Sequence, residues 1–278
     1  MSGSSRVRGL VELTRPVNAV AAGVLTFIGA FVAGGVAGSL VRVGAAVAAT
    51  VLAVGAGNAI NDYFDREIDR INKPGRPIPS GAVSPRGALA FSVVLFVGAV
   101  VCALFLPVFA IALAAVNLVA LVAYTEYFKG LPGAGTAVVS YLGGSTFVFG
   151  AAAVGDPMAG VVLGVLAALS TFTREVIKDV EDVEGDREEG LNTLPIAVGE
   201  RASLWLAAVL LVVAVAASPL PYVWGTFGAP YLAVVALADL VMAFAAYRGF
   251  SDPAASQSVL KYGMFLAAAA FVVGRLTV

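Results

Sequence analysis

The sequence predicts an all-α, polytopic membrane protein, a bundle of about nine transmembrane helices in two four-helix halves plus one. Three observations predict this class. Hydrophobic residues make up 60% of the 278 positions and charged residues only 13%, whereas soluble domains are roughly half apolar and about a quarter charged. Charge-free runs are long enough to cross a bilayer, and basic residues gather between alternate runs. Lipid is therefore the expected solvent.

The predicted spans follow from the charge-free runs, because a transmembrane helix needs about 20 mostly apolar residues. The charge-free runs that predict them are residues 16–41, 43–61, 87–125, 130–155, 157–173, 202–238 and 256–276. The run 87–125 is long enough for two helices, with a break at Pro107. The run 202–238 holds a seventh helix, a turn at 218–221 and the start of an eighth helix that reaches Tyr247. The first span follows a basic stretch, as in a signal peptide, but its 26 charge-free residues favour a retained helix.

The orientation follows from the basic residues. With nine spans, the N-terminus and four of the connections share one side of the membrane, and this side holds all 17 lysines and arginines except Arg42 and Arg275. Basic connections mark the cytoplasmic side. We expect a multi-pass protein of the cell membrane, with the N-terminus and the connections after the second and sixth spans in the cytoplasm.

Composition excludes several kinds of chemistry. The net charge of −1 argues against a nucleic-acid partner, and no obligate protein partner is evident. Cys102 is the only cysteine and there is no histidine, so intramolecular disulfides, Cys/His zinc sites and histidine acid–base catalysis are ruled out. Carboxylate oxygens remain, and these suit hard cations such as Mg²⁺.

A first acidic stripe follows the second span. Asn61, Asp65 and Asp69 recur every four residues, and Asp62 lies next to the first of them. At 100° per residue the three carboxylates fall within about 60° of one another on one helix face. Pro74 cannot continue this helix, which is expected to end two residues earlier.

A second acidic stripe follows the sixth span. Glu175, Asp179, Asp182 and Asp186 share one face if the helix persists to the last of them, and Gly185 is a candidate for an earlier end. Like charges four residues apart destabilise a helix. A solvated helix end would explain surface acids, but it would mix lysine and arginine among them. Two aligned stripes indicate two metal-binding faces across a cavity that opens to the cytoplasmic helix ends.

Charge arithmetic suggests a ligand for these faces. Asp65, Asp69, Asp182 and Asp186 contribute −4 and two Mg²⁺ ions contribute +4, which leaves a diphosphate to be held by metal and basic groups. Mg²⁺ prefers few carboxylates together with substrate phosphate oxygens. The candidate basic groups are Lys73, Arg76, Lys129, Arg174 and Lys178. The metal would neutralise charge that develops on a departing diphosphate.

The chain is expected to form a single transmembrane domain, residues 1–278. Each acidic stripe follows the second helix of a four-helix set, which indicates an internal duplication into halves of about residues 10–130 and 131–278.

The motifs resemble those of the UbiA-type intramembrane prenyltransferases. Asn61-x₃-Asp65-x₃-Asp69, with its continuation through residues 72–81, is similar to the first family signature, and Asp182-x₃-Asp186 to the second. Further similarities are Tyr124-x₄-Lys129 and the start Arg15-Pro16-x-Asn18, whereas Thr136 departs from the family's usual Asn. The resemblance covers essentially the whole chain.

The resemblance implies prenyl transfer from a prenyl diphosphate donor to a lipophilic acceptor, with Mg²⁺ as cofactor and membrane lipid as surroundings. It implies metal ligation by Asn61, Asp65, Asp69, Asp182 and Asp186, catalytic roles for these residues, and stabilisation of an allylic cation by the ring of Tyr124. An equally good interpretation of Tyr124 is an interfacial aromatic residue. The implied substrate-binding residues are Lys73, Arg76, Lys129, Arg174, Lys178, Asp62 and Asp179. Because the chain has no histidine, the acceptor's proton would pass to a carboxylate such as Asp62, or deprotonation would occur late in the reaction.

The acceptor is predicted from a more specific resemblance. Residues 174–186 and 193–199 are most similar to the archaeal branch of the family that makes digeranylgeranylglyceryl phosphate, which implies a geranylgeranyl donor and ether formation on geranylgeranylglyceryl phosphate. Hydroxybenzoate or quinone precursors and chlorophyllide are the alternative acceptors. An ion-coupled transporter is the alternative of another class, but its acids would lie near the membrane midplane.

Two further polar residues lie inside or beside spans. Asp239 is mid-span, where an acid is costly enough to be a functional candidate or a hydrogen-bonded structural group. Lys261 opens the last span and either reaches the cavity or extends to the interface. Gly143 and Gly144 indicate close helix packing.

Overall fold

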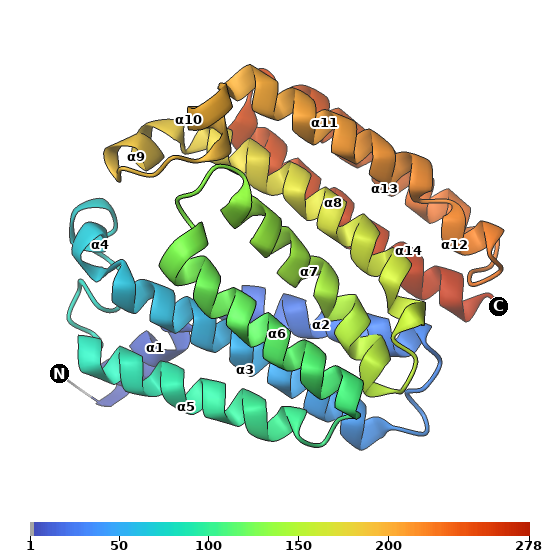
Figure 1. Cartoon of the computed structure of the whole chain (residues 1–278), viewed down its shortest axis with the longest axis horizontal. Helices are drawn as coiled ribbons and strands as arrows, with labels where there is room; N and C mark the ends of the chain where they lie inside the picture. Colours follow the sequence, from blue (N-terminus) through green and yellow to red (C-terminus); the bar gives the residue numbers. More distant parts are fainter. Residues whose placement is uncertain (1–2) are drawn as a thin grey trace.

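The computed structural model describes residues 3–278, and every regular element in that range is helical (Figure 1). The helices are α1 (Gly3–Leu13), α2 (Pro16–Val32), α3 (Leu40–Phe64), α4 (Arg66–Asn72), α5 (Pro85–Ala103), α6 (Val108–Ala123), the π-helical turn η1 (Tyr124–Phe128), α7 (Ala134–Ala153), α8 (Met158–Glu181), α9 (Val183–Glu188), α10 (Leu194–Val198), α11 (Glu200–Ala217), α12 (Leu220–Val223), α13 (Pro230–Arg248) and α14 (Pro253–Leu276).

The predicted number of spans agrees with this arrangement. In the described range, eight helices or joined helix pairs are long and apolar enough to cross a membrane. The ninth span is the pair α1–α2, which bends by 46° between Leu13 and Pro16. The all-α membrane fold is therefore confirmed, and Pro107 does precede α6 as predicted.

Some predicted boundaries were wrong. The first span was expected to reach residue 41, but α2 ends at Val32 and a loop follows. Residues 218–221 were expected to form the turn between the seventh and eighth spans. Instead, the chain continues there into the helical turn α12, and the connection lies farther on, where Gly225 has a positive φ of 74°. Proline is compatible with the first turn of a helix, which explains how this segment remains helical.

Close contact between α2, α7 and α8 depends on glycine. A Cβ atom on Gly150 of α7 would overlap the backbone of Thr26 in α2, and one on Gly144 would overlap that of Gly164 in α8. Small residues let transmembrane backbones approach in this way. The prediction that Gly144 serves helix packing is therefore confirmed.

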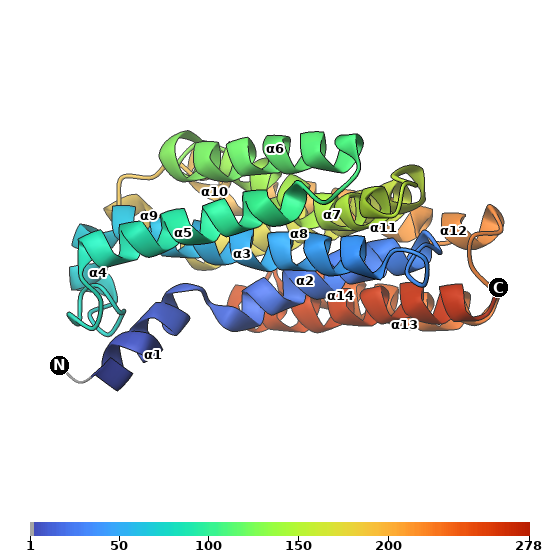
Figure 2. The same cartoon turned by 90° about the horizontal axis from the view of Figure 1, so that it is seen from below.

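The remaining helices surround α2, α7 and α8, and the two ends of the bundle carry different short helices. In Figure 1, α1, α4, α9 and α10 lie at one end of the bundle, which we call the motif end, and α12 and the last residues of α14 lie at the other. Viewed from below, α6 forms one face of the bundle, and α13 and α14 lie on the opposite face (Figure 2). The short helices that follow α3 and α8 are thus gathered at one level.

Candidate active site

Each acidic motif lies at a break between a long membrane helix and a short one. Asp65 joins α3 to α4 with φ −78° and ψ 1°, and Asp182 joins α8 to α9 with φ −91° and ψ 4°. At each break the amide of the aspartate still donates to the carbonyl four residues earlier, with an N–O distance of 2.9 Å. A continuous first helix was therefore the wrong expectation, although α4 does end at Asn72 as predicted. For the second stripe the sequence left an earlier end open. The second break comes at Asp182, whereas Gly185 lies inside α9.

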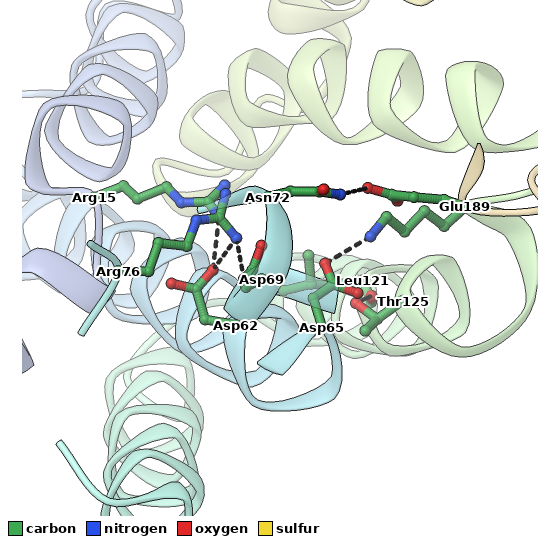
Figure 3. A network of polar contacts seen from close by, with 10 residues as sticks. Arg15, Asp62, Asp65, Asp69, Asn72, Arg76, Leu121, Thr125 and Glu189 are labelled. Carbon is green, nitrogen blue, oxygen red and sulfur yellow. Dashed lines mark hydrogen bonds and ion pairs between the residues drawn. The ribbon is translucent and has the colours of Figure 1, made fainter. Parts of the chain in front are cut away.

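Two arginines hold the first motif together. Arg76 donates to Asp69 at 2.6 Å and to Asp62 at 3.2 Å, and Arg15 donates to Asp62 at 2.7 Å (Figure 3). The side chains of Asp62 and Asp69 are only 6% and 5% exposed. Burying charge requires pairing of this kind. Arg15 itself has a positive φ of 47°, a conformation disfavoured for a non-glycine residue.

Asp65 has a different partner, from another helix. Lys129 donates to its carboxylate at 2.6 Å, as the dashed line to Asp65 in Figure 3 marks. Lys129 directly follows the π-helical turn η1, and its amide donates to the carbonyl of Tyr124 at 2.9 Å. π-Helical turns inside α-helices are frequent at functional sites. The turn couples the position of Tyr124 to that of the lysine.

The second motif is held mainly by contacts within and beside α8. Lys178 donates to Asp182 at 2.8 Å, and the hydroxyl of Thr136 in α7 donates to Asp179 at 3.1 Å. Thr136 thus contributes a hydroxyl to the second motif. Burial raises the pKa of the Asp186 carboxyl. Its ionised form is disfavoured until a positive partner arrives.

The structure brings the two motifs together across the motif end. Asn72 at the end of α4 donates to Glu189, just after α9, at 3.2 Å, although 117 residues separate them (Figure 3). The amide of Asn192 donates to the carbonyl of Gly130, at 3.0 Å. Lys73 is exposed beside this region, and among the described residues it forms no ion pair. The segments that carry the two motifs and the loop after η1 therefore meet at the motif end.

The site offers oxygen ligands suited to a hard cation. The side-chain oxygen of Asn61 is buried and has no hydrogen-bond partner, which is unusual for a buried polar atom. In the part of the chain that the structure describes, no three acidic groups are close enough to hold a metal without other ligands. Mg²⁺ normally takes one or two carboxylates plus phosphate oxygens and water. These residues fit such an ion when substrate completes its shell.

A small polar pocket of about 30 Å³ lies among η1 and the loop after it, α7 and α8. It is lined by Tyr124, Lys129, Leu131, Gly135, Thr136, Val139, Glu175, Asp179 and Thr193. The hydroxyl oxygen of Thr193 is buried without a hydrogen-bond partner. This pocket brings three predicted residues, Tyr124, Lys129 and Asp179, to one place.

Two larger cavities extend into the bundle. The first has a volume of about 280 Å³ and lies among α2, α7, α8, α11, α13 and α14, with Arg174 and Lys261 in its lining. The second, about 190 Å³, lies among α3, α5, α6 and α7, and its lining is almost entirely apolar. Leu121, one turn before Tyr124, lines this second cavity. Both cavities can receive hydrocarbon.

Sequence reasoning missed several members of the site. Arg15 was noted only as part of a similar N-terminal start, yet it binds Asp62. Glu175 was placed on the second stripe without a role, and it accepts a hydrogen bond from Arg174 at 2.5 Å. Glu189 carried no signal, because its role depends on a contact between distant segments. Thr193 was noted only within the similar stretch 193–199, yet it lines the small polar pocket.

The chain is similar to proteins of known type along nearly its whole length. Residues 22–269 match the UbiA prenyltransferase family. The digeranylgeranylglyceryl phosphate synthase of Halobacterium salinarum is 66% identical over 269 residues, which cover 97% of this chain and 98% of the relative. That of Natronomonas pharaonis is 65% identical over 98% of this chain and 99% of its own length.

Solved structures of UbiA-type proteins share the fold of this chain. A structure described as giving insights into digeranylgeranylglyceryl phosphate synthase in membranes has a TM-score of 0.85 and 34% identity, covering 98% of this chain and 99% of its own. A UbiA homologue from Archaeoglobus fulgidus, bound to GPP and Mg²⁺, shares the fold with a TM-score of 0.68 and 17% identity, over 96% of this chain and 99% of that one. The protein is a prenyltransferase and belongs to the UbiA prenyltransferase family.

Proposed function

We propose that this chain transfers a geranylgeranyl group from geranylgeranyl diphosphate to the free hydroxyl of geranylgeranylglyceryl phosphate, with Mg²⁺ as cofactor. The observation that carries the proposal is the meeting of the two aspartate motifs at the motif end, beside two apolar cavities. The named relatives support the acceptor and the donor, since they resemble this chain over nearly its full length.

The donor's diphosphate would lie between the motifs. Asn61, Asp65, Asp69, Asp182 and Asp186 would hold Mg²⁺, which supplies positive charge that stabilises the leaving diphosphate. Lys129 and Lys178 each donate to a motif aspartate in the structure. Once the metal neutralises these carboxylates, both ammonium groups would turn to phosphate oxygens. Arg76 would keep Asp62 and Asp69 in place, since both are buried.

The hydrocarbon tail of the donor would enter the apolar cavity among α3, α5, α6 and α7. Leu121 lines this cavity and lies one turn below Tyr124, so the tail and the diphosphate would meet beside that ring. The C–O bond at C1 breaks as the diphosphate leaves, and the acceptor's oxygen bonds to C1. The hydroxyl proton is released with the diphosphate. The ring of Tyr124 would face the positive charge at C1.

The orientation belongs to this proposal as well. We place the motif end in the cytoplasm, because the basic residues of the sequence gather in the connections of that end. A water-soluble diphosphate donor head would then meet the site from the cytoplasm, and the acceptor's lipid tail would remain at membrane depth.

The test is product analysis by mass spectrometry. Purified protein in lipid nanodiscs is incubated with Mg²⁺, geranylgeranyl diphosphate and one acceptor at a time: geranylgeranylglyceryl phosphate, 4-hydroxybenzoate or chlorophyllide. We expect the two-chain ether from the first acceptor alone. Prenylation of 4-hydroxybenzoate or chlorophyllide, with no ether formed, would overturn the acceptor while leaving prenyl transfer intact. No product from any acceptor would overturn the proposed function.

A further inference from the structure

The larger cavity, about 280 Å³, has an uneven distribution of charge. Arg174 and Lys261 lie toward the motif end, near the end of α8 and the start of α14. Toward the opposite end, Asp239 accepts a hydrogen bond of 2.6 Å from Ser218, which follows the last residue of α11. Most of the remaining lining is apolar, including Phe147 and Phe271. The cavity is thus an apolar chamber with two cations at one end.

The two cations are incompletely partnered. Arg174 donates to Glu175 and, at 3.0 Å, to Gln257, but its Nε is buried and has no acceptor. A buried donor without a partner is rare and costs free energy. Lys261 lies 5.9 Å from the ring centroid of Phe265, and it forms no ion pair with any acid that the structure describes. A bound anion would satisfy both side chains.

Their position separates them from the diphosphate site. Arg174 precedes Asp182 by eight residues on α8, and at 1.5 Å per residue this places it about 12 Å farther along the helix, toward the interior of the bundle. Arg76, Lys129 and Lys178 pair with the motif aspartates themselves, whereas Arg174 pairs with Glu175 and leaves its Nε without an acceptor. Arg174 and Lys261 face a different space, so they serve a different anion.

We propose that Arg174 and Lys261 bind the phosphate of the acceptor, and that the cavity below them holds the acceptor's isoprenoid chain. The proposal rests on the proposed function. In glyceryl phosphate the hydroxyl is only a few bonds from the phosphate. A phosphate on these cations therefore leaves the hydroxyl near the small polar pocket that Tyr124 and Glu175 line, where the donor's C1 would lie. Asn18 of α2 is exposed and also lines this cavity.

The subsite makes selection for a phosphorylated acceptor a property of two side chains. An acceptor without phosphate would leave the Nε of Arg174 and the ammonium group of Lys261 without an anionic partner, and a site built for a charged group discriminates strongly against an analogue that lacks it. Aromatic and tetrapyrrole acceptors present no phosphate at that distance from their nucleophile. Arg174 and Lys261 would thus determine the acceptor specificity of this prenyltransferase.

Binding without turnover provides the first test. Wild-type protein and the variants Arg174→Gln and Lys261→Gln, in nanodiscs without donor, are titrated with radiolabelled geranylgeranylglyceryl phosphate and with geranylgeranylglycerol. We expect each variant to weaken binding of the phosphate lipid by about 10-fold or more, the value of one charge-assisted contact, and to leave binding of the uncharged lipid unchanged. The matched control is Arg248→Gln, which removes a half-buried cation of α13 that is paired with Asp252.

Steady-state kinetics provide the second test. Each glutamine variant should raise KM for the phosphorylated acceptor and leave KM for geranylgeranyl diphosphate unchanged, and Arg174→Lys should restore part of the loss. Equal weakening of both lipids, or a raised donor KM with unchanged acceptor binding, would overturn the subsite. These readouts separate the two proposals, because inactive protein that still binds the phosphate lipid through these cations retains the subsite and refutes only the proposed reaction.

Discussion

The acids of the two motifs are stabilised by cations of the chain itself. Asp65 binds Lys129, Asp69 binds Arg76, and Asp182 binds Lys178, at distances of 2.6, 2.6 and 2.8 Å. Carboxylates at this spacing repel one another, and partial burial increases the cost. The pairs therefore fix the acids in position before substrate arrives. Under the proposed function, the carboxylates would hold Mg²⁺ and the same lysines would then bind phosphate.

This arrangement predicts the effect of neutralising single aspartates. Asp65→Asn and Asp182→Asn should each lower kcat by about 100-fold or more, since each removes charge that would hold the proposed Mg²⁺ ion. Turnover at saturating donor and acceptor measures the effect. Glu67→Gln on α4 and Glu184→Gln on α9 are matched controls, because both acids are exposed on the same short helices. Full activity of the aspartate variants, or of wild-type protein in EDTA, would refute the metal site.

Tyr124 allows a separate prediction at the same scale. If its ring stabilises positive charge at C1, Tyr124→Phe should keep kcat within about 3-fold and Tyr124→Leu should lower it by about 10-fold, the difference expected from a desolvated cation–π contact. Donor KM should change little in either variant. Equal losses in the two variants would instead assign the role to the hydroxyl.

At the scale of elements, the breaks in the helices shape the site. α3 and α8 both end one residue before a motif aspartate, and each continues as a helix of six or seven residues. The π-helical turn η1 ends the span of α6 in a comparable way beside Lys129. The similarity of the two aspartate breaks supports the predicted duplication of residues 10–130 and 131–278, which remains a prediction. Long helices fix the depth of the site, and short helices place its second carboxylates.

The packing of these long helices can be tested at glycine. Gly150→Ala should destabilise the protein by about 1–3 kcal/mol, because the new methyl group would overlap the backbone of α2. Gly44→Ala in α3 should be neutral or slightly stabilising, since no atom lies within 4 Å of the added Cβ and alanine favours a helix. The midpoint of denaturant unfolding in detergent measures both. Equal midpoints would mean that α2 and α7 can separate at little cost.

At the scale of the whole molecule, the nine-span bundle places α1 and both motifs at one end and the end of α14 at the other (Figure 1). Because nine is an odd number of spans, the two ends of the chain lie at opposite ends of the bundle. Gathering all reactive groups at one end leaves the rest of the bundle apolar, so two hydrocarbon chambers can run from a single polar site into the membrane.

Thiol labelling tests the orientation. In a Cys102→Ser background, single cysteines at Gly75 and Glu184 should resist an impermeant reagent in sealed right-side-out vesicles, whereas a cysteine at Gly38 should react. All three positions are exposed, so access to the reagent depends on the side of the membrane. Labelling of Gly75 and Glu184 from outside would reverse the orientation. Labelling of the two from opposite sides would contradict the shared site.

The sequence by itself determined the membrane class, the span count, both aspartate motifs and the family. These features depend on local composition and spacing: a charge-free run of sufficient length has to be a span, and carboxylates four residues apart recur on one side of a helix. The prediction of prenyl transfer was confirmed for the same reason, since the motifs that carry it are contiguous in the chain.

Only the tertiary structure decided which groups meet. Arg15 and Arg76 converge on Asp62 from opposite sides of it in the sequence, and Asn72 meets Glu189 across 117 residues. No periodicity encodes such contacts, because they depend on how whole helices pack. The surroundings of Arg174 were likewise decided by helix packing. Its neighbours in sequence suggested the diphosphate site, whereas the cavity it shares with Lys261 arises where α8 and α14 lie against α2 and α13.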